Sequence, residues 1–198
     1  MAAILSDLNK TVIAGLILAV ALFILYYVTE GYSGASFGPF LFRWLHVLSG
    51  VMWIGLLWYF NFVQIPNMAN IPDEQKPAIS KVIAPAALYW FRWGAMATIV
   101  TGLILAWLNG YLVNAITIGL IDGVPKHTAI GIGMWLGTIM WFNVWFVIWP
   151  NQKKALGMVE ASADEKKAAG RTAMLFSRTN TLLSIPLLFA MVSAQNLY

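Results

Sequence analysis

Residues 42–64 read FRWLHVLSGVMWIGLLWYFNFVQ, an apolar run whose single formal charge is Arg43. The hydrocarbon core of a bilayer, about 30 Å thick, takes around 20 apolar residues in a helix, so this run is long enough to cross it. The rest of the chain has the same character. AVILMFWYC residues make up 60% of the 198 residues and charged residues 10%, against roughly 45–50% and about 25% in soluble proteins. This composition indicates a polytopic membrane protein and excludes a soluble enzyme.

Five stretches are long and apolar enough to span a membrane. They are residues 11–28, 40–65, 88–108, 126–149 and 174–194. Pro39 and Pro125 are expected in first helical turns, where a missing N–H costs little, and Pro186 is expected to kink the last span. Residues 110–124 are predicted to lie at the membrane interface, and residues 151–171 to form a solvated helix. The first span is too long for a typical cleaved signal and is expected to be an uncleaved anchor.

The basic residues predict the orientation, because cytoplasmic loops carry an excess of Lys and Arg. An internal N-terminus puts ten of the 12 basic residues on the cytoplasmic side and leaves only Arg43 and Lys126 outside. The ten are Lys10, Lys76, Lys81, Arg92, Lys153, Lys154, Lys166, Lys167, Arg171 and Arg178. We expect the chain in a bacterial inner membrane, with its C-terminus in the periplasm. The basic residues form no cluster that would suggest nucleic-acid binding.

Two parts of the chain resemble each other at an offset of 82 to 86 residues. MWIG at 52–55 is echoed by MWLG at 134–137, and FN and PN pairs follow both, at 60–61 with 66–67 and at 142–143 with 150–151. The pattern predicts two helical hairpins, residues 40–109 and 125–196, duplicated in the same direction. The expected fold of residues 1–198 is therefore one all-α transmembrane domain. The two hairpins form a four-helix bundle, and one further helix precedes them at the N-terminus.

Each hairpin owns one of the chain's two histidines, His46 and His127. Each histidine is followed four residues later by a glycine, Gly50 or Gly131, on the same helix face. Each also has a cation beside it, Arg43 or Lys126, suited to pair with a haem propionate. These features predict one haem b held by both imidazoles, a coordination suited to electron transfer, with Trp53 and Trp135 among its dry walls.

Other interpretations of these residues stay open. Each histidine could be a simple interfacial residue with its polar tip in the headgroups. Counted from Pro39 and Pro125, the two histidines differ in depth by roughly 7 Å, and counted from the inner prolines by about 4–5 Å. The larger difference favours two separate sites or ligands shared across an oligomer. Asn61 and Asn143 are expected to tie helices together.

Several kinds of chemistry are poorly supported by the sequence. With no Cys, the chain cannot form disulfides, cysteine zinc sites, iron–sulfur clusters or c-type haem attachments. Met52, Met134 and Met140 are expected to serve packing, since no dense Met/His cluster favours copper. No carboxylate is expected within the hydrocarbon, which argues against a proton-coupled transporter.

Residues 42–64, together with MWLG at 134–137 and the WFN run at 141–143, resemble the membrane domain of the bacterial membrane-bound urate hydroxylase (urate oxidase N-terminal) family. The resemblance extends from about residue 40 to the C-terminus. It implies redox work at the outer face, and we expect a short, membrane-only relative without the family's c-type cytochrome domain. We therefore expect a membrane-embedded b-type haem protein that exchanges electrons with a partner protein or within a larger complex. The alternatives are a non-catalytic accessory subunit and a urate-oxidising component.

Overall fold

The structure is a computed structural model that describes residues 2–198. Five of its helical segments are long and apolar enough to cross a membrane, as the composition predicts. They run over Leu8–Thr29, Gly34–Asn67, Lys76–Leu108, Pro125–Ala155 and Ala163–Asn196. The chain divides into two compact units, Met1–Phe40 and Leu41–Tyr198, and strands are absent from the described residues.

The N-terminal unit contains a short helix α1 (Ala2–Leu5) and the first spanning helix α2 (Leu8–Thr29). Asp7 caps α2, because its side chain accepts hydrogen bonds from the backbone N–H groups of Asn9 and Lys10. None of the residues of α2 is buried. The predicted first span is confirmed, extended by three residues at its start and one at its end.

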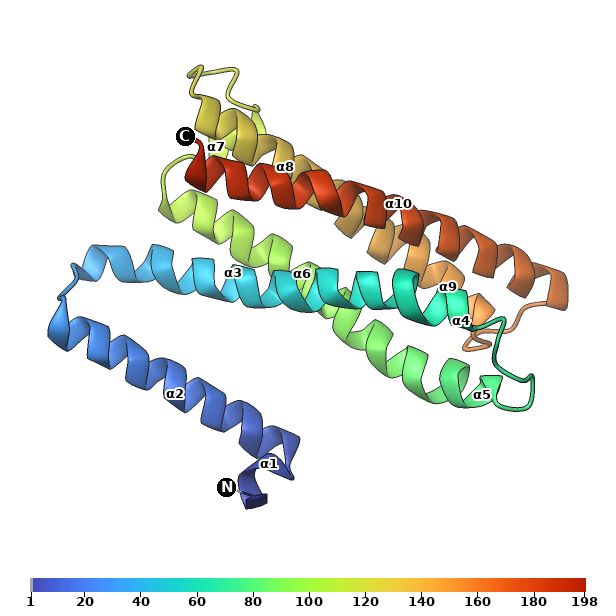
Figure 1. Cartoon of the computed structure of the whole chain (residues 1–198). Coiled ribbons are helices and arrows are strands. Elements are labelled where there is room, and N and C mark those ends of the chain that lie inside the picture. The colour runs from blue at the N-terminus through green and yellow to red at the C-terminus, as the bar shows by residue number, and fades with distance from the viewer. Residues whose placement is uncertain (1) are drawn as a thin grey trace. The chain divides into compact units, whose positions relative to one another are not determined.

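The C-terminal unit contains the other four spans, drawn in Figure 1. Three of them contain a π-helical segment. Their elements are α3 (Gly34–Trp58), which starts in the N-terminal unit, with η1 (Tyr59–Gln64) and α4 (Ile65–Asn67); α5 (Lys76–Ala78), η2 (Ile79–Ile83) and α6 (Ala84–Leu108); α8 (Pro125–Phe142), η3 (Asn143–Ile148) and α9 (Trp149–Ala155); and α10 (Ala163–Asn196).

Two predicted helix starts are wrong. Pro39 does not open the second span, because α3 begins at Gly34 and contains Pro39; near the start of a helix the lost N–H is tolerated. Residues 163–171 are not a separate solvated helix but the first turns of α10, which Ser162 and Glu165 start with a reciprocal capping box. The prediction for Pro125 is confirmed, since it lies in the first turn of α8.

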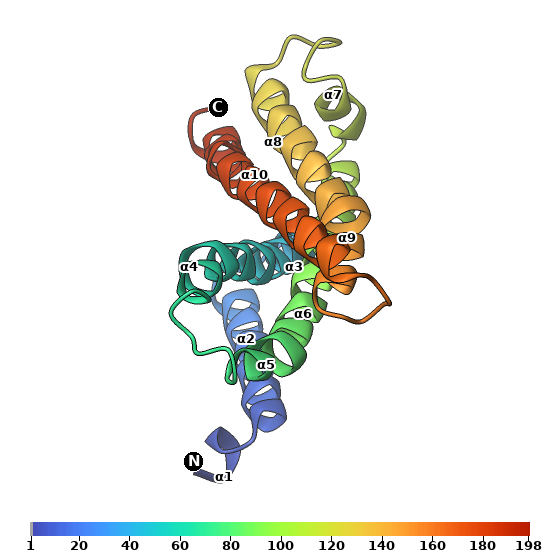
Figure 2. The ribbon, with the colours of Figure 1, turned by 90° about the vertical axis from the view of Figure 1, so that its right-hand side faces the viewer.

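One apolar core joins all four helices of the C-terminal unit. It includes Trp53 and Leu57 from α3, Phe91 from α6, Met140 from α8 and Leu187 from α10. Helices α8 and α10 run side by side in both views (Figures 1 and 2).

Two glycines on α8 bring it close to α10. A Cβ added at Gly137 would lie 3.4 Å from Leu187 Cδ1, and one at Gly133 would lie 3.0 Å from Met191 Cε. The small residues at 133 and 137 therefore allow α8 and α10 to pack closely.

Asparagine side chains connect helices inside the bundle, as predicted. Asn61 Nδ2 donates to Ser177 Oγ at 2.8 Å, and Asn143 Nδ2 donates to Asn180 Oδ1 at 2.8 Å. Asn180, which is fully buried, in turn donates to the Met140 carbonyl at 2.9 Å. Both asparagines therefore bind α10, so α10 holds one helix from each predicted hairpin.

Two of the π-helical segments, η1 and η3, begin 84 residues apart, within the offset of the predicted repeat. A π-helical turn holds one more residue than an α-helical turn, and it shifts the faces of the helix on its two sides. The matching position accords with the duplication, which stays a prediction.

Arg92 lies on an aromatic side chain. Its Cζ atom lies 3.3 Å from the centroid of the Trp149 ring, within the range of a cation–π contact. Arg92 thereby joins α6 to α9.

The connection between α6 and α8 folds back onto the start of α8. It holds the short helix α7 (Leu112–Ile116) and turns at Gly110 and Gly119, whose φ angles of +76° and +70° favour glycine. A Cβ added at Gly131 would lie 3.0 Å from Ile118 Cα. Gly131 is therefore the point at which this connection packs against α8.

Candidate functional site

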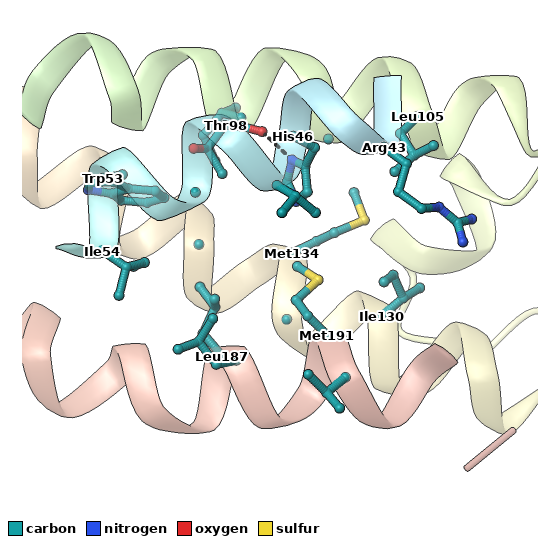
Figure 3. A pocket seen from close by; sticks show the side chains of 18 of the residues that line it. Arg43, His46, Trp53, Ile54, Thr98, Leu105, Ile130, Met134, Leu187 and Met191 are labelled. Carbon is teal, nitrogen blue, oxygen red and sulfur yellow. Dashed lines mark hydrogen bonds between the residues drawn. The ribbon is translucent and has the colours of Figure 1, made fainter. Parts of the chain in front are cut away.

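A cavity of about 610 Å³ lies among the four helices of the C-terminal unit (Figure 3). It is lined by residues 43–58 of α3, 98–106 of α6, 130–138 of α8 and 187–196 of α10, together with Tyr111. It lies at the end of the bundle where α3 and α8 begin and α6 and α10 end. Its volume falls within the range of cofactor and ligand sites, roughly 300–1,000 Å³.

His46 is the imidazole on the wall of this cavity. Its Nδ1 lies 2.9 Å from the Thr98 carbonyl of α6 and 3.4 Å from Thr101 Oγ1. Because a carbonyl only accepts, Nδ1 carries the hydrogen, and the lone pair of the neutral ring is on Nε2. Within residues 2–198, Nε2 has no hydrogen-bond partner. A backbone carbonyl that fixes one ring nitrogen is the usual support of a metal-binding histidine.

Gly102 allows His46 to lie against α6. A Cβ added at Gly102 would lie 2.9 Å from His46 Cε1 and 3.1 Å from Nδ1, but 3.8 Å from Nε2. The ring therefore meets α6 with its Nδ1–Cε1 edge, and Nε2 points further from that helix. Residue 102 must be glycine for this arrangement.

The two glycines predicted to make room for a flat macrocycle differ. Gly50 lines the cavity, and a Cβ added there meets nothing within 4 Å. Gly131 does not line the cavity, because the backbone of the 115–118 segment covers it. Only the patch below His46 is open.

Arg43 lines the cavity near the start of α3 (Figure 3). Its Nη1 donates to Gln195 Oε1 at 3.1 Å, which joins the start of α3 to the end of α10. This is the one formal charge among the residues that line the cavity. Arg43 could bind a carboxylate at this end of the site.

His127 does not line the cavity, and neither does Lys126. The Nδ1 atom of His127 lies 2.5 Å from Asp122 Oδ2, which also accepts from Asn114 Nδ2 at 2.6 Å. The His127 ring stacks on Tyr111 with centroids 5.5 Å apart. Since Tyr111 lines the cavity, its ring separates His127 from the cavity.

Two ionisable groups beside His127 have shifted pKa values. Burial raises the pKa of the Tyr111 hydroxyl, although nearby Arg43 works against that shift. For Asp122, partial desolvation opposes ionisation. The hydrogen bonds from His127 and from the Val124 N–H outweigh it, and the pKa of the carboxyl is lowered. Asp122 therefore stays ionised next to His127 at neutral pH.

The two predicted tryptophans also lie in different places. Trp53 is buried, 1% exposed, and forms part of the cavity wall (Figure 3). Trp135 is exposed and donates from Nε1 to the Ile116 carbonyl at 2.9 Å, which ties α8 to α7. Of the eight predicted site residues, the cavity brings together Arg43, His46, Gly50 and Trp53.

Two thioethers occupy the cavity wall formed by α8 and α10, those of Met134 and Met191. Figure 3 shows Met134 reaching from α8 toward His46 and Arg43. Sequence reasoning assigns Met134 to packing and does not single out Met191, Gly102 or Asp122. The roles of these three residues depend on contacts between helices. Only Asp122 has a sequence signal, because it lies in the glycine-containing connection just before His127.

Part of the cavity rim consists of side chains that are themselves exposed. Val47 and Val51 of α3 and Val192 of α10 line the cavity with exposed fractions of 55%, 68% and 59%. We call these three residues the valine rim. Within the C-terminal unit, the cavity is therefore open at its side, along the helices.

Comparison with known protein families finds a match in the C-terminal part of the chain. Residues 124–197, which form α8, η3, α9 and α10, match the family model described as urate oxidase N-terminal. No curated protein and no solved structure matches the chain. The predicted resemblance is thus confirmed for the second hairpin, while for residues 40–123 it stays a prediction. Over residues 124–197, the chain is similar to the urate oxidase N-terminal family.

Proposed function

We propose that this chain is a membrane-embedded b-type haem protein that transfers electrons near the periplasmic face of a bacterial inner membrane. The observation that carries the proposal is the state of His46. Its Nδ1–H is engaged by the Thr98 carbonyl, and its Nε2 keeps a lone pair at a cofactor-sized apolar cavity. This is the arrangement of an imidazole prepared to bind a metal.

The residues present fit a haem. The cavity volume suits a cofactor, and Gly50 leaves a helix face free for a flat ring one turn from His46. Arg43 supplies a positive charge for a propionate. When bound, the haem iron supplies one-electron chemistry, with a potential set by its ligands and surroundings.

Each residue has a separate part in this proposal. His46 holds the iron through Nε2, while Thr98, Thr101 and Gly102 fix the ring in place. Trp53 and the apolar wall around it exclude water, which lowers the local dielectric and so helps to set the reduction potential. The electron partner is a redox protein or a larger membrane complex.

A reduced-minus-oxidised spectrum of the protein purified with haem supplied during expression tests the proposal. We expect the α-band of a b-type haem, lost in His46→Gly and recovered when imidazole is added. Gly170→Ala, whose new Cβ would make an ordinary 3.7 Å contact, is the control for handling and folding. A wild-type protein without an α-band, or a His46→Gly spectrum equal to wild type, contradicts the proposal.

A second candidate, a non-catalytic subunit of a membrane complex, is favoured by α2. The residues of this helix are all unburied, so they are available to lipid or to another protein. Recovery in a stoichiometric membrane complex that contains no haem in this chain would support this candidate over the first.

The family match also suggests urate oxidation as an activity to test. The matched family is described by urate oxidase, and the match covers only the second hairpin. Membranes that contain this protein alone, assayed for urate consumption with an artificial electron acceptor, test this activity. Consumption that disappears in His46→Gly would extend the proposed electron transfer to urate.

A further inference from the structure

We infer that Met134 provides the second axial ligand, on the face of the haem opposite His46. The inference rests on the proposed haem and replaces His127 as the expected partner of His46. A thioether sulfur is an established axial ligand of haem iron, paired with histidine in cytochromes. Met134 and Met191 are the two sulfur-bearing side chains that line the cavity.

Contacts between α6 and α8 place Met134 at the level of His46. A Cβ added at Gly137 of α8 would lie 3.9 Å from Ile99 Cδ1 of α6, so these positions share a level. The His46 ring lies against Gly102, three residues along α6 from Ile99. Because α6 and α8 run in opposite directions, three residues back along α8 from Gly137 reaches Met134. The thioether and the imidazole thus come from the same depth.

His127 lies at another depth. It is seven residues before Met134 on α8, which corresponds to about 10 Å along a helix. Its Nδ1 bonds to Asp122, and its ring stacks on Tyr111, which itself forms the cavity wall. The depth mismatch between the two histidines in the sequence therefore has a structural reason: they do not face one site.

Met191 serves packing instead. Its Sδ and Cε atoms would lie 3.2 and 3.0 Å from a Cβ at Gly133, so its side chain rests on α8 and fills the place of a side chain at 133. Met134 packs beside the buried cluster of Ala115, Ile130 and Ala194, and Figure 3 shows its thioether directed toward His46 and Arg43. The Met191 sulfur lies against α8 at Gly133, which leaves Met134 as the candidate ligand.

The electronic consequence follows from the ligand. Thioether sulfur stabilises ferrous iron more than a second imidazole does, so His/Met coordination raises the reduction potential relative to bis-His coordination. The chain is therefore suited to accept electrons from donors too weak for a bis-imidazole centre.

Absorption, magnetic circular dichroism and redox titration of four variants test the inference. The wild type is expected to show low-spin haem with the thioether-to-ferric-iron charge-transfer band. Met134→Leu keeps the haem and the volume but loses this band and the low-spin signature, and it gains carbon monoxide binding. Met191→Leu, the matched control, and His127→Ala keep the wild-type spectrum. Met134→His restores low-spin haem at a lower potential.

The outcomes separate this inference from the proposed function. Suppose that the wild type shows an α-band, Met134→Leu keeps the wild-type spectrum and His127→Ala becomes high-spin. That result overturns Met134 as a ligand and supports a site made by the two histidines. Loss of the band in Met191→Leu alone moves the ligand to α10 and also overturns the inference. No haem in the wild type removes the proposed function itself, and the inference with it.

Discussion

At the scale of single residues, the contact between Gly102 and His46 determines what the cavity can bind. The imidazole is held between the Thr98 carbonyl and the bare Cα of Gly102. A fixed ring orientation is what makes an imidazole lone pair useful to a metal. Glycine at position 102 is therefore as necessary for this arrangement as His46 itself.

Gly102→Ala should displace the His46 ring, because the added Cβ would lie 2.9 Å from Cε1. Overpacking of this kind costs about 1–3 kcal/mol, and the ring would lose its bond to Thr98. We expect at least a several-fold loss of haem occupancy, measured by pyridine haemochrome per protein. Gly170→Ala, in an uncrowded position of α10, should keep full occupancy; equal occupancy in both variants would contradict this account.

Asp122 should make the protein less stable when the pH falls into the acid range. Its pKa is lowered in the fold, chiefly by hydrogen bonds from His127 and Val124 that overcome desolvation. The ionised form therefore stabilises the protein above the ordinary carboxyl pKa, about 3.9. That contribution is lost as the pH falls through the lowered value.

The melting temperature of the wild type and of Asp122→Asn, measured in detergent against pH, checks this dependence. The wild type should melt higher near neutrality, and the two curves should converge on acidification. Both proteins share every other carboxylate, so the difference isolates Asp122. Curves that stay parallel down to strongly acid pH would argue against the Asp122–His127 bond.

At the scale of elements, α10 is the helix that binds both hairpins. It receives Asn61 through Ser177 and Asn143 through Asn180, and it packs on the glycines of α8. Such polar contacts connect helices where both lipid and protein are apolar.

Asn180→Leu should weaken this connection. It leaves Asn143 Nδ2 and the Met140 carbonyl without their partner in the bundle, a loss of about 1–3 kcal/mol. Asn109→Leu is the control, since the Asn109 side chain bonds only within its own helix, to the Leu105 carbonyl. Unfolding in mixed micelles measures both, and equal destabilisation would show that α10 is held by packing alone.

The elements themselves were largely predictable from sequence. Apolar runs of membrane length predict all five spans, and Pro125 marks its helix start correctly. Helix ends were less predictable. Gly34–Phe40 joins α3 because a proline such as Pro39 is tolerated near the start of a helix. Residues 163–171 join α10 because the helix continues past the point where the apolar run gives way to polar residues.

At the scale of the whole molecule, the proposed topology puts the cavity near the outer membrane face. Since the chain has no cysteine, a single introduced thiol reports its side of the membrane. Ile121→Cys, in an exposed loop at the cavity end, should react with an impermeant maleimide in cells whose outer membrane is permeable. Glu160→Cys, in the loop before α10, should react only after lysis. The reverse pattern would invert the orientation.

The site was only half predictable, and the reason is the distance along the chain between its parts. Arg43, His46, Gly50 and Trp53 lie on one helix, so local spacing finds them together. Their opposite wall comes from α6, α8 and α10, and which side chains face the cavity there depends on how those helices pack. The repeat predicts that both histidines contribute to the site in the same way, but the connection before α8 packs against the start of that helix, beside His127.

The valine rim has a thermodynamic consequence for any guest of the cavity. Val47, Val51 and Val192 open it sideways along the helices, so an apolar molecule that enters by this route exchanges acyl chains for protein side chains without meeting water. The release of ordered water, which drives most apolar binding, then contributes little, because lipid tails are as apolar as the cavity wall. Affinity must come from coordination, ion pairing and shape, so a porphyrin stripped of its metal should be retained poorly.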